Sequence, residues 1–220
     1  TLDRLFAKRN LIFTILFSAY CVGCLALMSD FGTALIFFVA FLCIAFLRTG
    51  DLPSIVMITA AAGFAGGIVL RFKPYVLARF AVWRHAWEYA QEEGYQQTRT
   101  MSAVASGGLF GAGPEEAWLK YVGAANTDLV FGVVSEEFGL LLALCAAAAV
   151  ILLGIYALRA AGRSRSSFYA IAACATAAML VFQTTLNVLG SVDLLPLTGV
   201  TFPFVSMGGS SMLSCWGLLA

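Results

Sequence analysis

The chain has 220 residues, of which 61% are hydrophobic and 11% are charged, and its mean hydropathy is +0.90. A soluble domain carries about 25% charged residues, so the composition excludes that class and indicates an integral membrane protein. The formal net charge of +1 gives no indication of a nucleic-acid partner. The six cysteines fall in apolar runs, so Cys21 and Cys24, although spaced as a CxxC pair, are better explained as small buried side chains than as a redox or zinc pair.

Long uncharged stretches divide the first third of the chain. Residues 11–28 are numerous enough to cross a hydrocarbon core of about 30 Å. Residues 31–47 and the glycine-containing stretch 52–70 follow, separated by short polar breaks. We predict three transmembrane helices here.

The segment 71–127 is more polar than the rest of the chain. Within it, residues 76–92 interleave charged side chains with tryptophan and tyrosine. This pattern predicts an amphipathic helix that lies in the headgroup region or packs on the outer surface of the bundle. The glycine-rich stretch 106–114 lacks the ending of a phosphate-binding loop, so we predict a tight turn that is either re-entrant or at the surface.

Three further apolar runs follow, at residues 129–158, 168–190 and 208–220, and we expect them to be a fourth span, a fifth span and the start of a sixth. The proline-rich segment 191–206 cannot be a regular helix, so within a membrane it must line protein or water. The chain opens without methionine and stops inside an apolar run. We therefore expect a single membrane domain, 1–220, that is a piece of a longer protein with about five complete spans and one truncated span.

The short loops predict the orientation in the membrane. Basic residues gather before the first span, at Arg48 and in the loop 159–165, whereas the short loops at Asp30 and Pro203 have none. The positive-inside rule places the basic loops in the cytoplasm. The large loop 71–128 and the proline-rich segment would then both lie outside the cell.

Three acids stand at or inside the fourth apolar run. Asp128 is either a general base at the water boundary or the N-cap of a helix, and the residues alone favour the cap. Glu136 and Glu137 are either a proton relay, or one of them holds a loop through Arg79, Lys73 or backbone amides. Adjacent helical positions lie about 100° apart, which disfavours a shared partner. We favour a structural or electrostatic role for at least one of the two glutamates.

Other polar residues leave alternatives open. Lys73, Arg79 and Arg84 could bind a phosphate, although at least one is expected to contact only solvent or lipid headgroups. Gln183 and Asn187 share a helix face, where buried amides more often join helices than touch substrate. The single histidine is not part of a cluster of metal-ligating residue types, so a tight protein-built metal site is not expected.

A series of short motifs runs in order along almost the whole chain: SDFGTA (29–34), PY (74–75) with Arg79, GYQ (94–96), SGGLFGAG (106–113), NTD (126–128), EEFG (136–139), LPLTG (195–199) and PFVSMGGSS (203–211). Each motif is weak alone, but the ordered set resembles the SEDS family of shape, elongation, division and sporulation proteins. The resemblance implies an all-α, polytopic transmembrane helix bundle with a large extracytoplasmic loop that contains an amphipathic helix. It further implies that this chain is the C-terminal part.

The function that the resemblance implies is peptidoglycan glycosyltransfer, the polymerisation of lipid II on the outer face of the bacterial cytoplasmic membrane. The implied partners are lipid II, a class B penicillin-binding protein transpeptidase, divisome or elongasome components, and membrane lipids, with no nucleic acid. The resemblance reverses the preference for a cap at Asp128 and makes it the general base. Cationic side chains would stabilise the charge that develops on the pyrophosphate, for which Arg79 is the first candidate and Lys73 the second. No cofactor is certain, although a divalent cation could be bound.

The substrate-binding residues expected on this basis are Lys73, Arg79, Gln96, Glu137, Thr198, Ser206 and Ser210. Several positions depart from the family pattern and leave the subfamily open: Tyr89 with Ala90, Arg99, Asn126 and Met207. Two alternatives remain. One is a lipid II flippase with Glu136 and Glu137 as its proton relay, and the other is a non-catalytic scaffold that recruits a transpeptidase.

Overall fold

The structure is a computed structural model that describes residues 16, 20, 23, 30–72 and 74–219. Every regular element within these residues is a helix, which confirms the predicted all-α fold. The predicted first span, 11–28, lies outside the described residues apart from three single positions. The other predicted spans can be compared with the structure directly.

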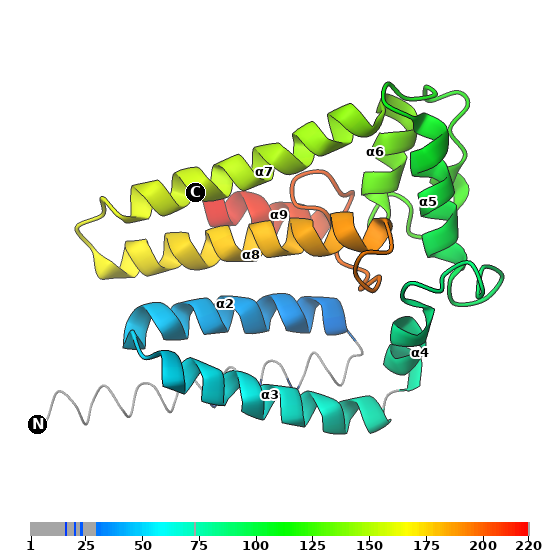
Figure 1. The fold of residues 1–220 in the computed structure, drawn as a ribbon. Helices are drawn as coiled ribbons and strands as arrows, with labels where there is room; N and C mark the ends of the chain where they lie inside the picture. The colour runs from blue at the N-terminus through cyan, green and yellow to red at the C-terminus, as the bar shows by residue number, and fades with distance from the viewer. Residues whose placement is uncertain (1–15, 17–19, 21–22, 24–29, 73, 220) are drawn as a thin grey trace, which may run out of the picture.

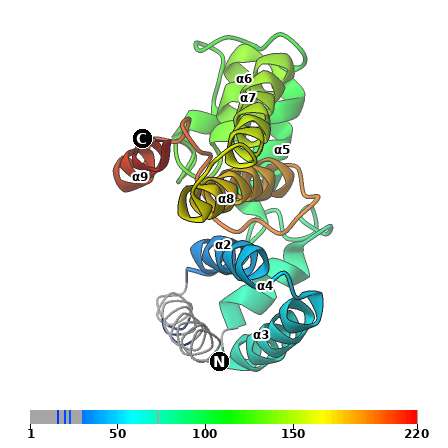
Figure 2. The same cartoon turned by 90° about the vertical axis from the view of Figure 1, so that its left-hand side faces the viewer.

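Five helices form the body of the described chain: α2 (Phe31–Thr49), α3 (Leu52–Phe72), α7 (Leu140–Ala161), α8 (Ser167–Ser191) and α9 (Gly209–Leu219). Among the described helices, α2, α7 and α8 are long and apolar enough to cross a membrane. Helix α8 lies between α7 and α2 and packs along both, and α3 lies beyond α2 (Figures 1 and 2). The bundle is therefore layered, with α8 at its centre.

Four short elements gather at the end of the bundle where α8 ends: α4 (Pro74–Val82), α5 (Tyr95–Gly107), η1 (Leu119–Tyr121) and α6 (Val130–Phe138) (Figure 1). The chain between α8 and α9, residues 192–208, is irregular and returns to the same end. We call it the 192–208 loop. Segments far apart in the sequence thus meet at one end of the molecule.

The predicted amphipathic helix over 76–92 is wrong in its length. Helix α4 ends at Val82, and Arg84 adopts a left-handed backbone conformation with φ of 65°. The Arg84 N–H donates a hydrogen bond of 3.0 Å to Oδ1 of Asp193, and Nε1 of Trp83 donates one of 3.1 Å to the Leu194 carbonyl oxygen. These contacts with the 192–208 loop turn the chain at a point where its charge pattern would allow the helix to continue.

The single span predicted over 129–158 is also wrong, because α6 and α7 are separate helices. Gly139 joins them with φ of 91°, and a Cβ placed there would clash with the Leu109 carbonyl oxygen. The glycine-rich turn after α5 packs on this junction: the Leu140 N–H donates to the Gly108 carbonyl, and the Ala112 N–H donates to the Glu136 carbonyl. As a result, Glu136 and Glu137 lie at the end of a short helix and not inside the span α7.

Two apolar clusters fix the 192–208 loop in place. Phe131 of α6, Leu180 of α8 and Phe202 of the loop are buried in one cluster, together with residues of α7. Val200 of the loop is buried with Ile36 of α2 and Leu186 of α8 in a second cluster. Burial of such side chains contributes about 1.5–3 kcal/mol each. The loop is therefore held on both sides, although it has no regular structure.

Candidate functional site

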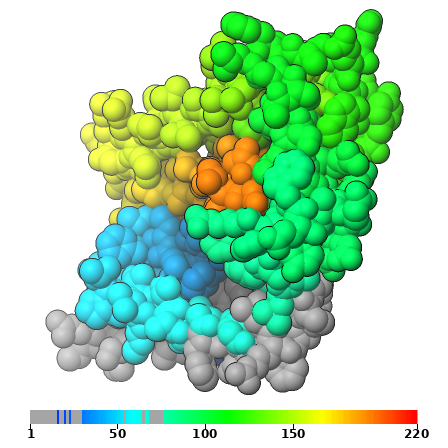
Figure 3. All heavy atoms as spheres, turned by 45° about the vertical axis from the view of Figure 1, so that its right-hand side comes forward, coloured from blue at the N-terminus to red at the C-terminus, as the bar shows by residue number. Residues whose placement is uncertain are grey.

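The 192–208 loop is seated where α2, α4, α8 and the segment before α6 meet. In the space-filling view, residues near the end of α8 (orange) lie recessed between the green segment that contains α4 and α5 and the blue helix α2 (Figure 3). Several of the predicted site residues come together around Gly199 of this loop.

Asp128 and Arg79 meet at Gly199 of this loop. A Cβ built on Gly199 would lie 3.3 Å from Oδ2 of Asp128 and 3.7 Å from Nη1 of Arg79. The φ of Gly199 is 72°, in the left-handed region that glycine tolerates best. Nη1 of Arg79 donates a hydrogen bond of 2.9 Å to the Leu197 carbonyl oxygen. A carboxylate and a guanidinium group from distant parts of the sequence therefore lie on one side of a single glycine.

The surroundings of Asp128 raise the pKa of its carboxyl group above the ordinary value. Burial is the largest cause, and the nearby charge of Asp30 acts in the same direction. A hydrogen bond from the Thr127 side chain and the charge of Arg79 lower the pKa but do not cancel the effect of burial. A raised pKa makes the ionised carboxylate a better proton acceptor.

Hydrogen bonds to the backbone hold Asp128 and its neighbours. Nδ2 of Asn187 donates to the Asp128 carbonyl oxygen at 2.9 Å, and Oγ of Ser206 donates to the Thr127 carbonyl oxygen at 2.6 Å. The N-cap of α6 is Leu129, and no side-chain hydrogen bond caps this helix. The cap that the residues alone favour at Asp128 is therefore wrong, and its carboxylate lies beside Arg79.

Glu136 makes a different kind of contact. Its side chain is 1% exposed, Oε1 accepts a hydrogen bond of 3.1 Å from the Trp118 N–H, and Oε2 accepts one of 3.0 Å from the Leu119 N–H. These two amides begin η1. Of the alternatives for the glutamates, Glu136 thus takes the loop-holding one, through backbone amides.

The remaining predicted site residues are divided between the surroundings of Gly199 and other places. Thr198 and Ser206 belong to the loop beside Asp128. Gln96 donates a hydrogen bond of 3.2 Å to the Gly123 carbonyl oxygen, in the segment leading to Asp128. Ser210 is exposed at the start of α9, where it is the neighbouring Ser211 hydroxyl that bonds to Thr201 at 2.8 Å. Lys73 lies outside the described residues.

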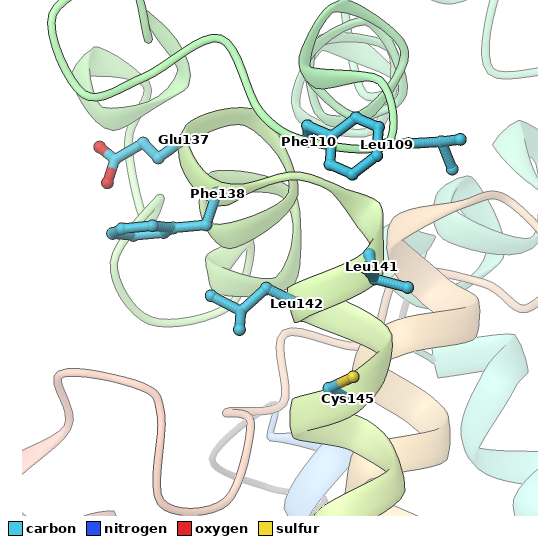
Figure 4. Close-up of a pocket in the computed structure, with 7 residues that line it drawn as sticks. All are labelled: Leu109, Phe110, Glu137, Phe138, Leu141, Leu142 and Cys145. Carbon is cyan, nitrogen blue, oxygen red and sulfur yellow. The ribbon is translucent and has the colours of Figure 1, made fainter.

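Glu137 lines a separate pocket of about 350 Å³ with apolar neighbours: Leu109, Phe110, Phe138, Leu141, Leu142 and Cys145. Figure 4 shows its carboxylate on the opposite side of α6 from Leu109 and Phe110, directed outward. Asp128 does not line this pocket. The structure therefore does not bring Glu137 together with Asp128.

An apolar groove of about 210 Å³ adjoins Arg79. It is lined by residues of α2, α3, α4 and the 192–208 loop: Phe31, Leu35, Gly66, Val76, Arg79, Phe80, Pro196, Leu197 and Thr198. One wall thus carries the guanidinium group that lies near Asp128. A molecule with a charged head and an apolar tail would match this combination.

A divalent cation needs several oxygen ligands converging on one point. Among the residues that the structure describes, no three side chains of His, Cys, Asp or Glu come together to form such a site. Asp128 has Arg79 beside it, a positive charge that disfavours a cation. These residues do not fit a protein-built metal centre, and we derive no step through one.

Sequence reasoning missed Gln97, a residue that supports the site. Gln97 is buried, and its Nε2 donates to the Gly190 carbonyl oxygen at 3.1 Å and to Oδ1 of Asp193 at 2.9 Å. These contacts join α5 to the end of α8 and to the loop. The motif around Gln96 indicated the position, but only the direction of the helix decides which of the two glutamines faces inward.

The layered bundle, with a half-buried carboxylate and an arginine at one end, defines an integral membrane protein with a polar site beside an apolar groove. The model of the family FTSW_RODA_SPOVE, described as "Cell cycle protein", matches residues 4–220. The chain belongs to this family, which includes the proteins whose motifs it resembles.

Curated relatives agree with this assignment. The chain is 32% identical over 209 residues to "Probable peptidoglycan glycosyltransferase FtsW" of Pseudoalteromonas translucida, which covers 90% of this chain and 51% of that protein. It is 33% identical over 202 residues to "Peptidoglycan glycosyltransferase RodA" of Mycobacterium leprae, which covers 90% of this chain and 43% of that protein. The chain thus spans about half the length of these relatives.

A solved structure has the same fold. It is described as "Structural coordination of polymerization and crosslinking by a peptidoglycan synthase complex". The match has a TM-score of 0.72 at 24% identity and covers 94% of this chain and 58% of that one. At this identity the likeness establishes the fold alone.

Proposed function

We propose that this chain is the catalytic part of a peptidoglycan glycosyltransferase that polymerises lipid II, with Asp128 as general base. The observation that carries the proposal is the meeting of Asp128 and Arg79 at Gly199, next to an apolar groove. The names of the curated relatives, which describe peptidoglycan glycosyltransferases, support the same activity.

The proposed step uses one proton acceptor and one positive charge. The acceptor sugar hydroxyl transfers its proton to the Asp128 carboxylate while its oxygen bonds to the anomeric carbon of the donor. The bond from that carbon to the pyrophosphate oxygen breaks, and the lipid pyrophosphate leaves with the electron pair. Arg79 stabilises the charge on this leaving group. Lys73 remains our second candidate for this role.

The apolar groove beside Arg79 suits the part of the substrate nearest the pyrophosphate. Its lining from α2, α4 and the 192–208 loop would hold the first units of a polyprenyl chain, while Arg79 faces the phosphates. Thr198 lines the same groove beside Arg79, whereas Ser206 is buried and its hydroxyl bonds to the backbone of Phe202 and Thr127, so it would support the site without touching the sugar. The positive-inside rule, applied to the basic loops, predicts that this end of the bundle lies on the outer side of the cytoplasmic membrane, where lipid-linked sugars would be polymerised.

A class B penicillin-binding protein transpeptidase is the partner that we propose. The fold neighbour belongs to a complex described as coordinating polymerisation and crosslinking, and a glycan polymerase needs a crosslinking enzyme to act on its product. The full-length protein is expected to work in the division or elongation machinery.

The decisive experiment is lipid II polymerisation by the purified full-length protein, comparing the wild type with Asp128→Asn and reading glycan-strand length on a gel. We expect polymer from the wild type and a loss of about 10²–10⁴-fold in rate in the variant. Equal polymer from both would remove Asp128 as the base. Movement of labelled lipid II across vesicles without polymer would favour a flippase, and neither activity, even with a transpeptidase added, would favour a scaffold.

A further inference from the structure

Asn187 joins two segments that flank the Asp128 carboxylate. It lies in the last turns of α8 and is 2% exposed. Its Nδ2 donates two hydrogen bonds, one of 2.9 Å to the Asp128 carbonyl oxygen and one of 2.6 Å to the Val200 carbonyl oxygen. One side chain therefore ties the segment before α6 and the 192–208 loop to the same helix.

The other half of the same amide is unsatisfied. Oδ1 of Asn187 is buried without a hydrogen-bond partner among the described residues. A buried amide oxygen without a partner is unfavourable. Turning the amide over would not relieve this, because Oδ1 would then face two carbonyl oxygens, which are also acceptors. The two carbonyls thus dictate the orientation of Asn187, and the fold retains an unfavourable oxygen to keep both contacts.

The contact with Val200 is linked to the site through the preceding residue, Gly199. Gly199 precedes Val200 and lies against both the Asp128 carboxylate and the Arg79 guanidinium group. The backbone of Asp128 and the backbone beside Gly199 are each one hydrogen bond from Asn187 Nδ2. The spacing between the carboxylate and the loop is therefore set in part by this amide.

Gln183 provides a natural comparison one turn earlier on α8. Its Nε2 donates to the Thr201 carbonyl oxygen and to the Thr201 hydroxyl, both at 2.9 Å. Gln183 thus holds the same loop with the same chemical group, but neither of these two bonds reaches the Asp128 segment. A comparison of the two amides therefore distinguishes a residue that only anchors the loop, Gln183, from one that also joins the loop to the segment of Asp128, Asn187.

We propose that Asn187 is a positioning residue that holds the Asp128 carboxylate in register with residues 197–200. The structural part of this proposal, that Asn187 joins the two segments, is based on the two hydrogen bonds. Its catalytic part, that this affects the reaction, rests on the glycosyltransferase activity proposed above. The inference makes Asn187 act through Asp128 without touching the substrate.

The structural part is tested by hydrogen exchange of the full-length protein in detergent, comparing Asn187→Leu with Gln183→Leu. We expect Asn187→Leu to increase exchange in peptides covering both 126–130 and 197–202, and Gln183→Leu to increase it only in 197–202. Equal behaviour of the two variants in 126–130 would overturn the proposal. If Asn187→Leu does not fold, Asn187→Asp is used instead. A neutral aspartic acid side chain has the shape of asparagine but at most one hydrogen-bond donor, so it cannot bond to both carbonyl oxygens.

The catalytic part is tested by lipid II polymerisation with the same variants. A displacement of the base predicts a fall in kcat of up to about 10²-fold with KM nearly unchanged in Asn187→Leu, and a much smaller fall in Gln183→Leu. Equal kcat losses, or a loss confined to KM, would overturn the positioning role. A wild type without polymerase activity would refute the proposed function, and the exchange experiment would still decide whether Asn187 joins the two segments.

Discussion

Asp128 and Glu136 lie eight residues apart in the sequence, yet their carboxylates differ in burial and in hydrogen bonding. Glu136 is fully buried, and each of its oxygens accepts a hydrogen bond from a backbone amide at the start of η1. Asp128 is half-buried, and its carboxylate lies beside the side chains of Arg79 and Thr127 and the backbone of Gly199. Glu136 is used to hold the fold together, whereas the Asp128 carboxylate remains partly exposed beside Gly199.

The difference shows how to separate a structural acid from a functional one. Backbone amides are fixed donors, so a carboxylate that accepts two of them is held in one position and has little capacity left for a substrate proton. A carboxylate whose pKa is raised by burial, and whose main charged neighbour is the side chain of Arg79, keeps that capacity. The predictions that follow test this contrast.

The largest effect on stability is expected from Glu136→Ala. The change leaves the Trp118 and Leu119 amides buried without an acceptor, at about 1–3 kcal/mol for each group. Thermal unfolding of the purified protein in detergent measures the loss. Glu137→Ala is the matched control, because this neighbour lines an open pocket, and its effect should stay within about 0.5 kcal/mol. Equal shifts for the two variants would contradict the structural role of Glu136.

A smaller loss is expected from Gly199→Ala. The backbone at this position is left-handed, and alanine adopts that conformation at a cost of about 1–2 kcal/mol. The added Cβ would also lie 3.3 Å from Oδ2 of Asp128. We expect lower polymerase activity together with a modest fall in unfolding temperature. Gly123→Ala is the control, because a Cβ there meets nothing within 4 Å and Gly123 lies in the same segment as Asp128. An activity loss in the control as large as in Gly199→Ala would argue against a special place for Gly199.

The positions of the helices could be predicted largely from the sequence, and the boundaries could not. The apolar runs over 31–47 and 168–190 predicted α2 and α8 to within two residues at each end, because length and lack of charge decide where a span forms. The run over 129–158 predicted one helix where there are two, because its apolar pattern passes through Gly139 without interruption. The break there depends on the close approach of the turn after α5, which is a tertiary contact.

The site could be predicted in its chemistry but not in its arrangement. The motifs pointed to Asp128 and Arg79, and the structure places them at one glycine. They also selected Glu137, which lines a separate pocket, and Gln96, whose bond goes to the backbone of Gly123 and not to Asp128 or Arg79. Residue spacing does not determine how each helix is rotated about its axis relative to the loop. This rotation decides that Gln97 faces inward and that Asn187 bonds to two carbonyl oxygens.

The pH dependence of polymerisation is expected to distinguish the neighbours of Asp128. The proposed mechanism requires the ionised carboxylate, so it predicts that the rate falls as pH decreases through the pKa of Asp128. Arg79 lowers this pKa and Asp30 raises it. Arg79→Gln should therefore move the acidic limb of kcat/KM to higher pH, and Asp30→Asn should move it to lower pH. Glu137→Gln should leave the limb in place, and a shift of both Arg79→Gln and Asp30→Asn in one direction would contradict the assignment of Asp128 as the base.

The smallest effect is a gain in stability from Asp128→Asn. Because burial raises the pKa of Asp128 in the folded protein, its contribution to stability is present below the unfolded-state pKa and is lost as pH rises through the folded-state pKa. At neutral pH the ionised carboxylate is thus retained at a net cost, which solvent screening keeps below about 1 kcal/mol. Asp128→Asn should raise the unfolding temperature slightly at pH 7, and the difference should vanish in acid. A loss of stability instead would mean that Asp128, like Glu136, serves the fold.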